Sequence, residues 1–279
     1  MVAIFSLLTT PLPLVDRSVI FLAMKIHPNT AGSMISLLII ALLAGAHGQT
    51  TNGVDADGYW DTSIGVPGSD GPIRAMVVTP STVVVGGSFG RIGGINANFI
   101  AQWDGHNWSG LGSGVTGGFG PQVLALAAQG GNIYAAGVFS LAGGVPAGNI
   151  AKWDGDKWSA LGTGIPTVVK ALAVSGTDLY AGAEFSSAGG VAAANIARWD
   201  GTNWHAVGSG LPGYTVNCLA ASRDALYVGG YFTNWMDGVE IKYLAKWDGL
   251  QWSPLGSRLY ADPYSVLLHS AVQEHEILI

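Results

Sequence analysis

A short motif with two tryptophans around an Asp-Gly pair recurs four times in this 279-residue chain. Successive copies begin 50, 46 and 48 residues apart, and a block of 15 residues precedes each copy. Length changes fall between the repeats, which indicates a rigid supersecondary unit with one variable connection. The motif copies are IAQWDGHNW (100–108), IAKWDGDKW (150–158), IARWDGTNW (196–204) and LAKWDGLQW (244–252), and the blocks span 75–89, 125–139, 171–185 and 218–232.

Each unit is predicted to contain four short strands. In the third unit, ALAV and LYAG are β-type runs separated by polar residues at 175–178, a pattern typical of a hairpin. NIARW and WHAVG flank Asp200-Gly201, and glycine supplies the positive φ that a tight hairpin turn needs. The flanking Trp199 and Trp204 should therefore lie opposite each other. The repeat extends this pairing to eight of the ten tryptophans.

Four strands in a unit of this length are typical of a propeller blade. The doublets Gly86-Gly87 and Gly229-Gly230, each followed by a tryptophan, resemble the kelch pattern. The segments LYVGGYF and LAKWDGLQWSPLGS also resemble those of secreted bacterial WDG-repeat propellers and of the fungal cortical polarity-marker family. The resemblance covers residues 60–279 and implies an all-β, kelch-like β-propeller. The second and third units depart from the doublet, with Ala136-Gly137 and Gly182-Ala183.

The repeat also defines expected domain boundaries. A β-propeller domain is predicted over 49–279, and its ends resemble fragments of a further blade: 59–68 a lone fourth strand, and 265–279 a first strand with the start of a second. A blade shared between the termini would close a ring. This one would lack its third strand, so an open arc on a truncated chain is expected. The predicted blades span approximately 72–115, 122–165, 168–211 and 215–257, with a partial blade at 264–279.

The first 48 residues are predicted to be an export signal. Residues 34–46 read MISLLIIALLAGA, an apolar run shorter than the ~20 residues of a membrane-spanning helix. Lys25 precedes the run, and small residues surround the expected cleavage after Gly48. Met24 is the expected start of translation. The alternative is a pair of membrane helices; the signal peptide instead predicts a mature chain without a membrane span, secreted or held at the cell surface.

Composition narrows the possible functions. The chain has 18 acidic and 12 basic residues, which disfavours a nucleic-acid partner held through phosphate contacts. Cys218 is the single cysteine, so neither an internal disulfide nor a cysteine zinc cluster can form. The G-x-G-x-x-G matches at 112–117 and 208–213 lie between predicted strands, whereas a nucleotide site needs a following helix. No cofactor is therefore expected.

The acidic residues and histidines do not lead to a predicted catalytic residue or metal ligand. The Asp-Gly turns account for the recurring aspartates, and the histidines lack metal-ligand spacing. Glu184 replaces a small residue in the third unit's block, directly before the constant phenylalanine. It is either an exposed substitution or a carboxylate that lines a central channel.

The variable connections are the candidate binding face, because loops on a rigid scaffold commonly carry binding residues. The connections between strands 2 and 3 and those between units should share one face. Aromatic residues there suit stacking on a sugar or anchoring a protein partner; alternatively, they cover the core. We expect a non-catalytic binding or scaffold module for protein or glycan, the alternative being an extracellular carbohydrate-active hydrolase, lyase or oxidase. The candidate residues are Phe119, Tyr214, Asn234, Trp235 and Tyr260.

Overall fold

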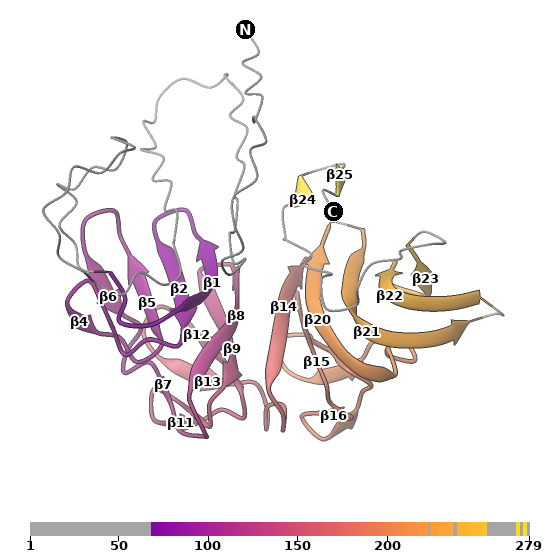
Figure 1. Ribbon diagram of the computed structural model, residues 1–279, viewed down its shortest axis with the longest axis horizontal. Coiled ribbons are helices and arrows are strands. Elements are labelled where there is room, and N and C mark those ends of the chain that lie inside the picture. Colours follow the sequence, from indigo (N-terminus) through magenta and orange to yellow (C-terminus); the bar gives the residue numbers. More distant parts are fainter. Residues whose placement is uncertain (1–67, 223, 237–238, 256–271, 274–275, 278–279) are drawn as a thin grey trace, which may run out of the picture. The chain divides into compact units, whose positions relative to one another are not determined.

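The computed structural model describes residues 68–222, 224–236, 239–255, 272–273 and 276–277 (Figure 1). The chain divides into Met1–Gly58 and Tyr59–Ile279, and all described residues belong to the second part. Strands, turns and bends make up the described residues, with no helix among them, so the all-β prediction is confirmed. The predicted signal peptide and the lone strand over 59–67 lie outside the described residues.

Four antiparallel sheets of four strands follow one another along the chain, one in each sequence unit (Figure 1). Each sheet pairs its strands in chain order, so each is a meander. Sheet 1 contains β1 (Ile73–Val78), β2 (Val83–Gly87), β5 (Ile100–Trp103) and β6 (Trp108–Gly110); sheet 2 contains β8 (Gln122–Gln129), β9 (Asn132–Val138), β12 (Ile150–Trp153) and β13 (Trp158–Ala160). Sheet 3 contains β14 (Val169–Ser175), β15 (Asp178–Ala183), β18 (Ile196–Trp199) and β19 (Trp204–Ala206); sheet 4 contains β20 (Gly213–Ala221), β21 (Leu226–Met236), β22 (Val239–Trp247) and β23 (Trp252–Pro254).

The tryptophans pair across the last hairpin of every sheet, as predicted. Trp199 lies directly opposite Trp204, with ring centroids 5.4 Å apart and planes tilted by 56°. The other three pairs have centroid distances of 5.4, 5.5 and 5.1 Å. Tilted pairs at this distance stabilise a hairpin by about 0.5–1.5 kcal/mol beyond their area burial. The turn glycines between them have φ near +100°, which explains why glycine follows the aspartate.

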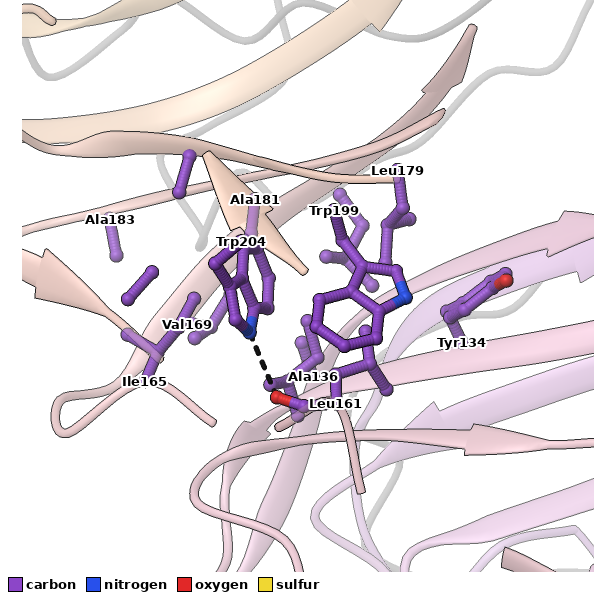
Figure 2. Close-up of a cluster of buried hydrophobic side chains, with 14 of the residues drawn as sticks. Tyr134, Ala136, Leu161, Ile165, Val169, Leu179, Ala181, Ala183, Trp199 and Trp204 are labelled. Carbon is purple, nitrogen blue, oxygen red and sulfur yellow. Dashed lines mark hydrogen bonds between the residues drawn. The ribbon is translucent and has the colours of Figure 1, made fainter. Parts of the chain in front are cut away.

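In sheets 2, 3 and 4, the tryptophan on the outer strand also joins its sheet to the preceding one. The indole Nε1 of Trp204 donates to the carbonyl oxygen of Leu161 at 2.8 Å (Figure 2). Trp158 and Trp252 donate equivalent bonds to Leu111 and Val207, at 2.7 and 3.1 Å. A buried apolar cluster that includes Trp199 and Trp204 fills the space between sheets 2 and 3 (Figure 2). Consecutive sheets are therefore held by both apolar packing and directional bonds.

The connections between strands 2 and 3 form short ribbons that the four-strand prediction did not include. The ribbon of sheet 2 also pairs with β7 (Val115–Thr116), which belongs to the connection leading out of sheet 1. In the third unit, Gly189 N donates to Gly164 O at 2.8 Å and makes the same link. The two kinds of variable connection therefore meet at one face, as expected. The ribbons are β3 (Arg91–Ile92) with β4 (Ile95–Asn96), β10 (Leu141–Ala142) with β11 (Val145–Pro146), and β16 (Ser187–Ala188) with β17 (Val191–Ala192).

The fourth unit differs from this pattern. The sequence placed a loop at residues 233–238, and this expectation is wrong, because β21 continues to Met236 and β22 starts at Val239. Met236 pairs directly with Val239. The dipeptide between them is Asp-Gly, which favours a two-residue hairpin turn. The fourth unit therefore extends its central hairpin instead of forming a separate ribbon.

A short hairpin near the C-terminus falls within the predicted partial blade at 264–279. β24 (Val272–Gln273) pairs antiparallel with β25 (Glu276–Ile277). Its register matches the first hairpin of sheet 3, where Ser175 pairs with Asp178 across an equally short turn. The pairing needed to close a ring involves residues 60–66, which lie outside the described residues.

Candidate functional site

The recurring aspartates are committed to their turns. The Oδ1 atom of Asp200 accepts the backbone N–H groups of Thr202 and Asn203 at 2.8 and 2.7 Å. These donors, together with the ring of His205 at 2.6 Å, lower the pKa of Asp200 to about 2. Backbone N–H donors likewise hold the pKa values of Asp104, Asp154 and Asp248 below the ordinary value. These carboxylates therefore act as turn caps, as the sequence predicted.

A β-bulge occurs at the same position in the first strand of every sheet. In sheet 3 the pairing with β15 jumps from Val169 to Ala171, and in sheet 4 the pairing with β21 jumps from Val216 to Cys218. A bulged residue leaves the ladder, and its side chain takes a new direction. Such bulges commonly lie beside functional sites. We call the four residues skipped at this shared position the bulge residues: Arg74, Leu124, Lys170 and Asn217. In sheet 4 a second register shift skips Tyr214.

The bulges explain why the sequence carries glycine doublets. A Cβ on Gly230 would lie 2.3 Å from the carbonyl oxygen of Thr215, and one on Gly137 would lie 2.2 Å from that of Gln122. Backbone approaches so closely here that a side chain would force the strands apart. Sheet 3 carries Ala183 at this position, fully buried opposite Val169. The doublets therefore accommodate the bulges, with sheet 3 as an exception.

Two bulge residues line a cavity at the junction of sheets 3 and 4. Lys170 comes from β14 and Asn217 from β20, and three further residues complete the lining: Tyr214, Thr215 and Tyr231. The cavity measures about 410 Å³. The Nζ atom of Lys170 donates to the Thr215 hydroxyl at 3.1 Å. A cation of one sheet therefore bonds directly to the next sheet.

Three tyrosines form a contiguous stack beside this cavity. Tyr214 and Tyr231 have ring centroids 4.9 Å apart, and Tyr231 and Tyr243 are 5.9 Å apart. Tyr214 is 67% exposed. Tyr243 adopts a φ of +63°, where the equivalent residues of sheets 2 and 3 are asparagines. Phe99 of sheet 1 has a φ of +73° at the same position, so the positive φ is a feature of the repeat in all four sheets.

The junction of sheets 1 and 2 repeats the polar part of this arrangement. The Nε atom of Arg74 donates to the hydroxyl of Ser88 at 3.2 Å, and that hydroxyl donates to Oε1 of Gln122 at 2.9 Å. Gln122 and Thr215 occupy equivalent positions in their units. In both junctions, a basic bulge residue is thus linked to the next sheet. The junction of sheets 3 and 4 adds the tyrosines.

Among the predicted binding residues that the structure describes, Tyr214 lines this cavity. Phe119 is fully exposed in the connection between sheets 1 and 2, so it belongs to a different junction. Asn234 and Trp235 lie in β21 and pair through their backbones with Ile241 and Glu240, not in the loop that was expected. Tyr260 lies outside the described residues. The five candidates therefore do not form one described cluster.

Glu184 lines a second cavity, of about 700 Å³, that shares the junction of sheets 3 and 4. Its side chain is exposed, and its carbonyl oxygen accepts the hydroxyl of Thr167 at 2.8 Å. The exposed-substitution interpretation agrees with this position. Glu184 is the one carboxylate among the described residues that line the cavity. Across the described part of the chain, no group of three or more histidine, cysteine or acidic side chains is placed to hold a metal ion.

Sequence reasoning missed Lys170, Asn217 and Tyr231, although the repeat carried a signal for them. Lys170 and Asn217 directly precede the 15-residue blocks, at a position whose residue type changes in every unit. Tyr231 directly precedes the constant phenylalanine of its block, again at a position that changes in every unit. Residues at such variable positions can change from unit to unit, because the constant positions beside them maintain the core.

No protein-family model matches the chain, and no curated protein matches it. Among solved structures, the chain is similar to the computationally designed Ika4 protein, with 16% identity and a TM-score of 0.40. That alignment covers 68% of this chain and 94% of Ika4. The computationally designed Ika8 protein gives 18% identity and a TM-score of 0.40, covering 66% of this chain and 62% of its own.

Proposed function

We propose that this chain is a secreted, kelch-like β-propeller that binds protein or glycan at or outside the cell surface without catalysing a reaction. Four meander sheets of the same strand order support the propeller arrangement. The first strand of each sheet contacts the first strand of the next, as inner strands of adjacent blades do. Bonds from the outer tryptophans of sheets 2, 3 and 4 to the preceding sheet indicate the same order of neighbours.

Binding rather than catalysis is supported by how the polar side chains are used. The four recurring carboxylates cap turns, and Asp178 forms an ion pair with Arg198 at 2.7 Å. The observation that carries the proposal is the cavity lined by Lys170 and Asn217, because both stand at a position whose residue type changes in every unit. Binding sites commonly combine a rigid scaffold with such variable positions.

A glycan array and a pull-down, both with the full chain, test this function. We expect a defined glycan or protein to be retained by the folded chain, and to be recovered chemically unchanged. The heat-denatured chain is the control, because it has the same composition and charge. Chemical turnover of the retained partner would contradict the proposal, and so would equal retention by the folded and denatured chains.

Export is tested separately by expression of the full chain in a secreting host. We expect the protein in the medium or at the cell surface, with Gln49 as its first residue after cleavage behind Gly48. Amino-terminal sequencing of the exported protein measures this. A chain that keeps residues 24–48 and stays inside the cell would contradict the export prediction.

A further inference from the structure

We propose that the cavity at the junction of sheets 3 and 4 binds a pyranose sugar that carries a carboxylate. This inference rests on the binding function proposed above and names its ligand class. The volume of about 410 Å³ falls within the ~300–1,000 Å³ typical of small-ligand sites. Its lining offers the contacts that an acidic sugar requires: an aromatic face, neutral hydrogen-bonding groups and one cation.

The aromatic face is provided by Tyr214. A pyranose ring presents apolar C–H groups on one side, and these stack on aromatic rings, while the tyrosine hydroxyl remains able to form hydrogen bonds. Tyr214 is largely exposed, yet its ring rests on Tyr231, which in turn contacts Tyr243. The three rings are carried by β20, β21 and β22 rather than by loops. Contacts between neighbouring rings limit how far the stacking surface must be ordered by a ligand, which reduces the entropic cost of binding.

The polar contacts come from the two bulge residues and their neighbour. Asn217 contributes an amide, and Thr215 contributes a hydroxyl, both suited to sugar hydroxyl groups. Lys170 uses one of its three N–H donors on Thr215, at 3.1 Å, which leaves two for a ligand. Both bulge residues are outside the ladder pairing, which gives their side chains a direction different from that of the paired residues.

The charge of the cavity selects an acidic sugar. Lys170 is the one charged group among the described residues that line this cavity. A carboxylate that meets the ammonium forms a charge-assisted hydrogen bond, roughly twice as strong as a neutral one. One lysine matches the single charge of a uronic acid. A protein partner would instead need about 800 Å² of surface, far more than this set of five residues provides.

Titration calorimetry of the full chain with trigalacturonate, and with neutral galactotriose for comparison, tests the site. We expect the acidic sugar to bind at least tenfold more tightly than the neutral one. Tyr214→Ala should weaken binding of both sugars at least tenfold, whereas Tyr214→Phe should stay within threefold of wild type. Lys170→Gln should remove the preference for the acidic sugar. Lys157→Gln changes an exposed lysine in an Asp-Gly turn and should leave both affinities unchanged.

Absence of binding by the wild-type chain would overturn the inference, as would unchanged affinities in Tyr214→Ala and Lys170→Gln. Both changes involve exposed side chains, and equal urea midpoints would establish that the variants fold. The pull-down distinguishes failure of the acidic-sugar site from failure of the proposed binding function. A partner captured equally by wild type and both variants would leave binding intact and refute this site. A wild-type chain that captures nothing would refute the proposed function itself.

Discussion

Gly182→Ala tests whether sheets 3 and 4 are packed as closely as the structure indicates. A Cβ at Gly182 would lie 2.4 Å from Cγ1 of Val216 and 3.4 Å from Cδ1 of Leu219. Val216 is fully buried on β20, so the added methyl group has no open space to enter. The substitution must therefore displace Val216 within the interface between the two sheets.

The expected cost follows from the contact distances. Carbon atoms pack best at about 3.5–4.0 Å, so the Val216 methyl group must retreat by more than about 1 Å. Overpacking of this kind costs about 1–3 kcal/mol, against which alanine regains about 0.5–1 kcal/mol that glycine loses in a strand. We expect a net loss of about 1–2 kcal/mol for Gly182→Ala. Val216→Ala alone should cost about 2–3 kcal/mol through lost burial and a cavity.

The double variant Gly182→Ala/Val216→Ala gives the decisive comparison. Without the valine methyl groups the clash disappears, and the new methyl group partly fills the cavity. The double variant should therefore lose no more than Val216→Ala alone, about 1–2 kcal/mol less than the sum of the single changes. Urea denaturation followed by tryptophan fluorescence measures the four free energies of unfolding.

The matched control uses the equivalent contact between sheets 1 and 2. A Cβ at Gly86 would lie 2.4 Å from Cγ1 of Val123, so Gly86→Ala should destabilise the chain to a similar extent. Its effect should add to that of Val216→Ala, because the two sites share no contact. Additivity of Gly182→Ala with Val216→Ala to within about 0.5 kcal/mol would refute the packing argument.

Three further predictions concern single side chains. Asn195 is 5% exposed with a φ of +65°; its side chain donates to Leu211 O at 2.8 Å and accepts from Phe185 N at 3.0 Å. Asn195→Ala should therefore lower the free energy of unfolding, measured by urea denaturation, by about 2–4 kcal/mol. Asn195→Gly should cost about 1 kcal/mol less, because glycine adopts this φ without strain. Trp204→Phe removes the bond to the preceding sheet and should lower the melting temperature, with a loss of about 1–3 kcal/mol; an unchanged midpoint would contradict the role given to that bond. Because the pKa of Asp200 is lowered to about 2, its ionised form stabilises the folded chain above about pH 4. This stabilisation is lost as the pH falls through about 2. Asp200→Asn should therefore make the urea midpoint depend less on pH between about pH 4 and about 2.

The strands and the tryptophan pairs could be predicted from the sequence because their spacing is visible in the repeat itself. The bulges could not, because a bulge depends on how two strands align, and residues such as Lys170 look like ordinary strand positions. The aromatic cavity was only partly predicted for the same reason. Tyr214 is an aromatic residue between units and was a predicted candidate. Tyr231 follows the glycine doublet that ends the predicted second strand, and its sequence position does not indicate the contact with Tyr214.

The fourth unit shows the limit of reasoning by equivalence between repeats. The first three units carry Gly-Gly between strands 2 and 3, which leads to a separate ribbon. The fourth carries Asp237-Gly238, and its flanking residues pair as a continuation of the hairpin. The differing residues 233–238 were expected to form a loop, whereas β21 continues to Met236 and β22 starts at Val239. The local turn residues were a better guide than the repeat at this position.

The tryptophan bonds between sheets have a consequence for the order in which the protein assembles. Each bond runs backward along the chain, from the outer strand of a later unit to a carbonyl group of the unit before it. During synthesis, the accepting carbonyl group therefore emerges from the ribosome before its donor does. Each new unit completes its last hairpin against a surface that already exists. Assembly can thus proceed vectorially, with every sheet serving as the template for its successor.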